Sequence, residues 1–237
     1  MKINVRQQPQ LGDVASTYVR QLIMSGELLP GDSVRPESIG ESLGISTTPA
    51  REALQALRVE GFLELVPRRG FQVAPLTGDD IRDLFAVQAL ISGELATRAA
   101  RLAGDADIDE LEALHLELIA AAKRNDLEEL EAKNHQFHRH INRLAQSRKL
   151  IWALGMMTQY VPRRFYADIP GWPQSTVDDH STILNAIRSR DPESIGRAVR
   201  AHLEHAGELL ASHFDARLEG LTASEGNKTS TPLISNL

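Results

Sequence analysis

The feature of the sequence that most constrains its fold is a tight turn at Gly44 between two short segments of helical character. The first segment runs from Pro36 to Leu43, and the second begins at Ser46 and ends before Gly61. Glycine commonly ends a helix, and serine or threonine commonly begins one. The residues around Gly44 therefore predict a helix, a tight turn and a further helix.

Local signals on both sides extend this pattern. Another helix is expected before it, from about residue 11 to 25, with its apolar residues on one stripe. Two short strands are expected at residues 62–66 and 71–73, joined by the turn Pro67-Arg68-Arg69-Gly70. Helix, helix, tight turn, helix and hairpin is the order of a winged helix-turn-helix domain, which we place at residues 1–76.

The helix that begins at Ser46 has a face suited to DNA. At about 100° per residue its apolar residues fall on one stripe, which we expect to be buried. The face opposite carries hydroxyl, amide and guanidinium groups and no carboxylate, and such donors suit the base edges and phosphates of a major groove. Arginines at the hairpin tip would add phosphate or minor-groove contacts. The predicted DNA-binding residues are Arg35, Ser46, Thr47, Thr48, Arg51, Gln55, Arg58, Arg68, Arg69 and Gly70. The alternative is an ordinary solvated helix face beside an exposed turn.

The net charge of −6 does not exclude a DNA partner. Residues 1–76 hold eight Lys or Arg and eight Asp or Glu, which leaves 18 of the 26 basic and 24 of the 32 acidic residues for the remainder. The acidic excess thus lies entirely outside the predicted DNA-binding domain. Because a neutral domain binds DNA weakly alone, two joined half-site contacts are expected.

Composition excludes several other classes of protein. The chain contains no cysteine, so disulfides, thiol nucleophiles and thiolate metal sites are absent. It has no unbroken apolar run of about 18 residues for a membrane span, and its first residues lack the apolar stretch of a signal peptide. We therefore expect a cytoplasmic protein with no membrane partner.

Residues 77–220 show helical periodicity throughout and offer no convincing strand. Helices are expected near residues 78–103, 107–124, 126–146, 148–166, 175–190 and 192–218. The fold class is therefore mainly α, with an all-helical bundle after the winged helix-turn-helix. Residues 221–237 are polar, rich in Ser and Thr and aperiodic, which indicates a disordered tail.

Polar residues lie on the apolar seams of three of these helices. Asn134 is followed one turn later by His138, and His180 and His202 each lie 11 residues from the helix break at Asp191. In an antiparallel hairpin the last two imidazoles would lie level, so three histidines and one amide oxygen would converge inside the bundle. Such a site suits Zn, Ni, Cu or Fe. The alternative is that each histidine is a hydrogen-bonded core residue.

Residues 15–74 resemble the winged-helix domain of GntR-type bacterial transcription regulators. The resemblance implies a homodimer that binds a palindromic operator, with Arg51 as a principal DNA contact. Thr47 stands where the family usually has arginine. The matching pieces are Ile23…Gly26-Glu27-Leu28…Pro30-Gly31, Leu43-Gly44-Ile45-Ser46, Thr48-Pro49-Ala50-Arg51-Glu52-Ala53-Leu54, Leu57…Glu60-Gly61 and Arg69-Gly70…Val73.

Residues 79–213 resemble the ligand-sensing domain of the FadR subgroup of these regulators, whose metal-binding members carry an Asp-x-x-x-His pair and two later histidines. The resemblance implies an effector-binding domain that holds one divalent transition metal, such as Zn or Ni, with a small organic acid beside or on it. The corresponding residues here are Asn134, His138, His180 and His202. Asn134 replaces the usual aspartate and is a poorer ligand for a dication.

Two further residues are candidates for effector binding. Gln88 occupies the place where the family commonly has an arginine early in the first bundle helix. Arg163, together with Arg164, is a candidate to attract an acidic ligand, and the alternative is that both arginines lie at a solvated helix end.

These features predict a ligand-responsive transcription regulator, a repressor that dimerises through the helical domain, and not an enzyme. Two alternatives stay open. A three-histidine site with an open position can activate water, as in a metal-dependent hydrolase. The metal can also be purely structural in a protein whose DNA binding is unregulated.

Overall fold

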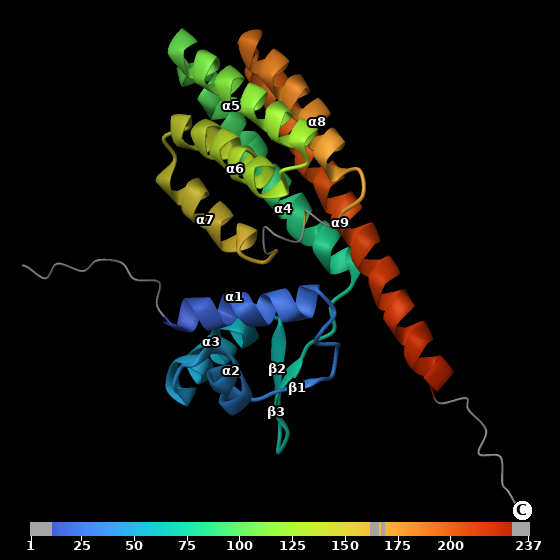
Figure 1. Ribbon diagram of the computed structural model, residues 1–237. Helices are drawn as coiled ribbons and strands as arrows, with labels where there is room; N and C mark the ends of the chain where they lie inside the picture. Colours follow the sequence, from blue (N-terminus) through green and yellow to red (C-terminus); the bar gives the residue numbers. More distant parts are fainter. Residues whose placement is uncertain (1–10, 162–165, 167–168, 229–237) are drawn as a thin grey trace, which may run out of the picture. The chain divides into compact units, whose positions relative to one another are not determined.

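The computed structural model describes residues 11–161, 166 and 169–228, which form two compact units (Figure 1). Of the described residues, the first unit comprises 11–76 together with 160–161 and 217–228, and the second comprises 77–159, 166 and 169–216. Each unit has its own buried apolar core.

The first unit combines three helices with a small antiparallel sheet. Its strand order is β1-β3-β2, with Val34 opposite Phe71 and Leu65 opposite the same residue on the other side. The strand β1 was not predicted, because two residues are too few to show a period of two. The elements are α1 (Leu11–Met24), β1 (Ser33–Val34), α2 (Pro36–Leu43), α3 (Thr47–Val59), β2 (Leu63–Val66) and β3 (Gly70–Val73).

The turn between α2 and α3 is as tight as predicted. Gly44 ends α2 in the left-handed conformation with φ 65°, which glycine adopts without steric cost. A Cβ atom on Gly40 would lie 2.9 Å from the carbonyl oxygen of Ile45, so the chain returns closely over α2. The inner side of α3 then packs into the core, where Leu54 and Leu57 are fully buried. This packing fixes which face of α3 remains exposed.

The second unit is an all-helical bundle, as predicted, and its described residues contain no strand. None of the described helices is both long and apolar enough to cross a membrane. The helices are α4 (Gly78–Leu102), α5 (Asp105–Arg124), α6 (Leu127–Leu144), α7 (Arg148–Thr158), α8 (Trp172–Arg188) and α9 (Pro192–Lys228).

Two helix ends differ from the sequence predictions. The helix α7 ends at Thr158 rather than near residue 166. Pro162 follows in the sequence, and a proline disfavours helical backbone in the residue before it. The helix α9 continues to Lys228, eight residues into the stretch 221–237 that was expected to be disordered. That stretch begins with good helix formers, among them Leu221 and Ala223. Residues 229–237 lie outside the described part of the chain.

Small residues bring α9 very close to α4. A Cβ atom on Gly207 would lie 2.5 Å from Cβ of Phe85, and a Cβ atom on Gly196 would lie 2.3 Å from Oγ1 of Thr97. Real Cβ atoms do not approach other atoms so closely, and the glycines therefore set the distance between the two helices. On its other sides α4 packs against α6 and α7.

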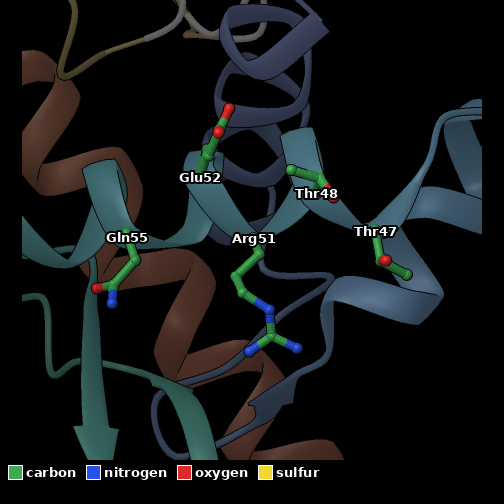
Figure 2. Close-up of a pocket in the computed structure, with 5 residues that line it drawn as sticks. All are labelled: Thr47, Thr48, Arg51, Glu52 and Gln55. Atoms are coloured by element: carbon green, nitrogen blue, oxygen red, sulfur yellow. The ribbon is translucent and has the colours of Figure 1, made fainter.

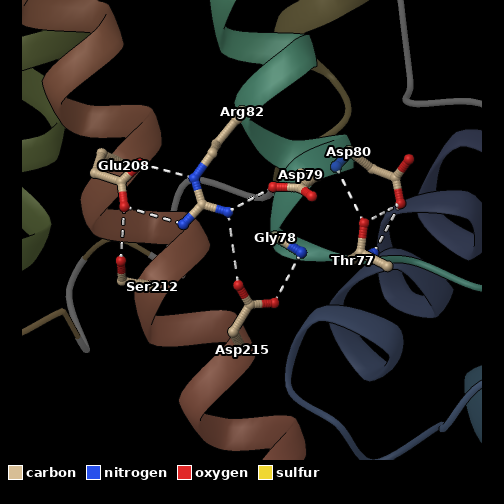
Figure 3. Close-up of polar contacts among 8 residues, drawn as sticks. All are labelled: Thr77, Gly78, Asp79, Asp80, Arg82, Glu208, Ser212 and Asp215. Atoms are coloured by element: carbon tan, nitrogen blue, oxygen red, sulfur yellow. Dashed lines mark hydrogen bonds and ion pairs between the residues drawn. The ribbon is translucent and has the colours of Figure 1, made fainter.

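The beginning of α4 is also tied to α9 by polar contacts (Figure 3). Thr77 caps the first turn of α4, and the Gly78 amide donates to Asp215 Oδ1 at 2.8 Å. Arg82 donates to both carboxylate oxygens of Glu208, at 2.7 and 3.0 Å. The Arg82 hydrogen bonds lower the pKa of Glu208 to about 2. These contacts fix the register of α4 and α9 at the start of the bundle.

Candidate metal centre and nucleic-acid interface

Three imidazoles from three helices converge inside the bundle. His138 comes from α6, His180 from α8 and His202 from α9. The Nε2 atom of His138 lies 3.1 Å from Nε2 of His202 and 3.2 Å from Nε2 of His180. The ligand atoms of all three lie within 4.8 Å of one another.

Apolar packing shields this cluster from water. His180 is 0% exposed and His202 is 5% exposed. The ring of Phe137 stacks on the His180 ring with centroids 4.3 Å apart. The cluster adjoins the bundle core formed by residues such as Ile141, Ile183 and Val199. The three nitrogens therefore face one another in an environment with little bulk water.

Burial determines the protonation of the cluster. It lowers the pKa of His138 and of His180 well below the ordinary value, and the neighbouring histidines lower both pKa values further. Both rings are therefore neutral near pH 7, and each has one nitrogen without a proton. Nδ1 of His202 lies 3.1 Å from Oδ2 of Asp179, a carboxylate that can only accept. If the His202 ring carries a single proton, this contact favours its placement on Nδ1, which leaves the lone pair on Nε2, the atom closest to His138.

The spacing of the nitrogens fits a metal ion. Histidine nitrogens bind zinc at about 2.0–2.1 Å, which places two neighbouring ligands of one ion about 3.0–3.4 Å apart. The separations of 3.1 and 3.2 Å between His138 and the other two histidines fall in this range. Three imidazole ligands suit a divalent transition metal. The residues present therefore fit the predicted group.

The predicted fourth ligand, Asn134, lies one turn before His138 on α6. Its Nδ2 lies 3.4 Å from each carboxylate oxygen of Glu131. Its Oδ1 is buried and has no hydrogen-bond partner among the residues that the structure describes. A buried carbonyl oxygen without a partner is costly, and a metal would satisfy it.

The other sequence predictions for the bundle have different outcomes. Gln88 is 5% exposed on α4, and Ser92, one turn later, is buried as well. Arg163 lies outside the described residues. His115, on another apolar stripe, lies 2.9 Å from Ser181 Oγ through its Nε2 and is not in the three-histidine cluster. Asp179 was missed, because its contact with His202 joins two helices and depends on their relative register.

The exposed face of α3 forms the candidate DNA interface. Thr47, Thr48, Arg51 and Gln55 line a shallow surface pocket together with Glu52 (Figure 2). Figure 2 shows the Glu52 side chain pointing away from those of Arg51 and Gln55. All ten residues predicted to bind DNA are exposed, whereas the apolar stripe of α3 is buried.

Besides Glu52, an acidic group from another helix adjoins this face. Oε1 of Glu37, from α2, lies 3.5 Å from Nη2 of Arg51. Both side chains are more than half exposed, so the pair is weak and screened by salt. Analysis of α3 alone could not reveal a neighbour from another helix. Arg51 remains available to a phosphate or a base.

The hairpin between β2 and β3 presents two arginines at its tip. Arg68 has φ 67° and Gly70 has φ 79°, and the amide of Arg69 donates to the carbonyl of Val66 at 3.0 Å. This tight turn leaves both arginine side chains exposed. The hairpin, which is the wing of this domain, therefore carries two positively charged side chains beyond the end of the sheet.

Two family models match the chain, one in each of its two parts. The profile of the gntR family of bacterial regulatory proteins matches residues 12–73, and the profile of the FCD domain matches residues 83–205, more than half of the chain. The chain belongs to the GntR family, with an FCD domain. It is a DNA-binding transcription regulator with a ligand-responsive helical domain.

Relatives of this GntR-family chain extend over most of its length. The Glc operon transcriptional activator of Escherichia coli (strain K12) is 28% identical over 233 residues, covering 88% of this chain and 91% of the relative. The HTH-type transcriptional repressor RspR of the same strain is 25% identical over 196 residues, covering 81% and 85%. The solved structure of E. coli McbR/YncC has the same fold, with a TM-score of 0.66, 19% identity, and coverage of 87% of this chain and 100% of that one.

Proposed function

We propose that this protein is a cytoplasmic transcriptional repressor that senses a small carboxylate through a divalent metal held by the FCD domain. The observation that carries the proposal is the convergence of three imidazoles on one point. His138, His180 and His202 would hold the metal, and the free oxygen of Asn134 would complete the set.

The charge of the ligand set favours an anionic effector. All four donors are neutral, so a dication bound to them keeps both positive charges, and a buried charge needs a partner of opposite sign. When bound, the metal would supply an open coordination position for a carboxylate oxygen. Gln88, buried on α4, would donate to that effector through its amide, and Arg163 would attract it.

DNA recognition rests on α3 and on the hairpin tip. Thr47, Thr48, Arg51, Gln55 and Arg58 would enter the major groove from the exposed face of α3. The remaining predicted residues, which are Arg35, Ser46, Arg68, Arg69 and Gly70, would contact phosphates or the minor groove. The two winged helices of a homodimer would then bind the halves of a palindromic operator.

Exposed apolar residues of the bundle support a homodimer. Leu90 and Val87 lie one turn apart on α4 and are 61% and 43% exposed, and Trp152 and Met156 lie one turn apart on α7 and are 63% and 50% exposed. The helices α4 and α7 pack against each other. Apolar residues so exposed on neighbouring helices are typical of a surface that a partner covers. We propose that a second copy of the chain covers these four residues.

The proposal is tested by metal analysis combined with DNA binding. Purified protein should contain about one divalent transition metal per chain, as three well-placed ligands predict. His138→Ala should lose that metal, while His140→Ala, on the same helix but outside the cluster, should retain it. A panel of small mono- and dicarboxylates should then weaken binding of the metal-loaded protein to the DNA upstream of its own gene.

The effector can act only through different affinities for the DNA-competent and DNA-incompetent states. DNA affinity that no carboxylate changes would therefore contradict the sensing mechanism and favour a structural metal. A reporter gene fused to that upstream DNA should be more active when the regulator's gene is deleted. Reduced reporter activity after deletion would identify an activator instead.

A further inference from the structure

The α8 residue directly before a metal ligand also contacts a second ligand. Asp179 precedes His180, and its Oδ2 lies 3.1 Å from Nδ1 of His202 on α9. The same oxygen lies 3.3 Å from Nδ1 of His205, one turn further along α9. Nδ1 of His205 lies in turn 3.2 Å from Oγ of Ser175. Asp179 therefore joins the three-histidine cluster to a polar chain that reaches the surface.

The Asp179 carboxylate lies between two imidazoles of α9. Its Oδ2 is within hydrogen-bond distance of Nδ1 of His202, at 3.1 Å, and of Nδ1 of His205, at 3.3 Å. An ionised carboxylate only accepts hydrogen bonds, so the proton of His202 is held on Nδ1. The other nitrogen, Nε2, is thereby fixed as a lone pair that faces His138. By contrast, Nδ1 of His180 is buried without a hydrogen-bond partner among the described residues.

The same carboxylate also supplies charge. Three imidazoles and the amide of Asn134 give a ligand set without negative charge. Asp179 places one negative charge a single hydrogen bond away from the ligand atoms, and Glu131 holds the Asn134 amide through longer contacts of 3.4 Å. Carboxylates that hold the outer nitrogen of a ligating histidine orient the ring and raise its basicity.

We propose that Asp179 is the positioning residue of the metal centre, orienting His202 and supplying from outside the ligand set the negative charge that Asn134 does not provide. This inference rests on the metal centre of the proposed function. Asp179 would then determine which ring nitrogen of His202 carries the proton, and it would also balance part of the positive charge of the metal.

Two substitutions separate orientation from charge. Asp179→Asn keeps an oxygen that can accept from His202 Nδ1 but removes the charge, whereas Asp179→Ala removes both. Zinc affinity is measured by competition with a chelator at pH 7.5. We expect Asp179→Asn to bind zinc about 10-fold more weakly and Asp179→Ala about 100-fold more weakly than the unaltered protein, the range seen when such outer partners are lost.

A matched control and a rescue distinguish this role from a merely structural one. Asp178→Asn changes the neighbouring exposed carboxylate, which accepts from Gln174, and should leave zinc affinity unchanged. Asn134→Asp added to Asp179→Asn returns a negative charge to the ligand set. The double variant should recover at least the tenfold zinc affinity that Asp179→Asn loses. Circular dichroism of each metal-free variant checks that the bundle is folded.

The possible failures can be told apart. Unaltered protein that binds no zinc would overturn both this inference and the proposed metal centre. Unaltered protein that binds zinc, together with Asp179→Asn of equal affinity, would overturn the role of Asp179 alone. An equally large loss of zinc affinity in Asp178→Asn and in Asp179→Asn would also overturn the role of Asp179.

Discussion

At the scale of single residues, burial makes the histidine cluster sensitive to acid. His180 is fully buried, and its pKa lies well below the ordinary value of 6.5. In the unfolded chain the same imidazole titrates near 6.5. Below that pH the unfolded chain takes up a proton that the folded protein does not, so stability falls as the pH falls.

The first prediction is a pH dependence of the metal-free protein. Its free energy of unfolding should decrease between pH 6.5 and 5.5, with His180 contributing about 1 kcal/mol of that decrease. His180→Gln should remove that contribution and flatten the profile. Urea denaturation at pH 7.5, 6.5 and 5.5, with a chelator present, measures both profiles. Parallel profiles for the two proteins would contradict the assignment of a neutral buried imidazole.

At the scale of helices, glycines control how closely α9 lies on α4. Alanine is about 1 kcal/mol more favourable than glycine in a helix. At Gly207, however, a methyl group would meet Phe85 at 2.5 Å, whereas at Gly155 on α7 it would meet nothing within 4 Å. The same substitution should therefore have opposite effects at the two positions.

The second prediction follows from this contrast. Gly207→Ala should lower the free energy of unfolding by about 1–3 kcal/mol, because overpacking a tight contact outweighs helix propensity. Gly155→Ala should raise it by about 0.5–1 kcal/mol. Urea denaturation followed by circular dichroism measures both. A stabilising Gly207→Ala would show that the two helices are not in close contact there.

The sequence predicted which segments form helices and the hairpin, because glycines, prolines and capping residues mark most of their ends locally, but it misplaced the ends of α7 and α9. It missed β1, whose two residues pair with β3 through tertiary contact alone. It also missed Asp179, since no local signal shows that α8 and α9 bring this carboxylate to His202. His180 and His202 could be predicted because their equal spacing from Asp191 encodes their register in the sequence itself, and His138 could be predicted because it lies on an apolar seam one turn after Asn134.

At the scale of the whole molecule, two copies of the chain should act together on DNA. The winged helix-turn-helix carries no net charge across residues 1–76, so a single copy binds DNA weakly. Linking two such domains raises apparent affinity by about 10²–10⁴-fold when both halves engage. Regulated DNA binding therefore depends on the proposed contact through α4 and α7.

The third prediction tests this contact. Leu90→Glu combined with Trp152→Glu should reduce the mass in light scattering from that of a dimer to that of one 26.2 kDa chain. The same change should weaken DNA binding by at least about tenfold, because avidity is lost. Leu116→Glu on α5, where the side chain is 59% exposed, is the matched control and should remain dimeric. A dimeric double variant would exclude this surface as the interface.

The central claim is that the exposed face of α3 binds DNA, and the most direct test is the affinity of Arg51→Ala/Arg58→Ala for the DNA upstream of its own gene at physiological salt. Each arginine that contacts a base or phosphate contributes about 1–3 kcal/mol, so we expect the double variant to bind at least about 30-fold more weakly, with a shallower dependence on salt. Arg101→Ala, which removes an exposed arginine of α4, should bind as the unaltered protein does. Unchanged affinity and salt dependence in Arg51→Ala/Arg58→Ala would contradict the account.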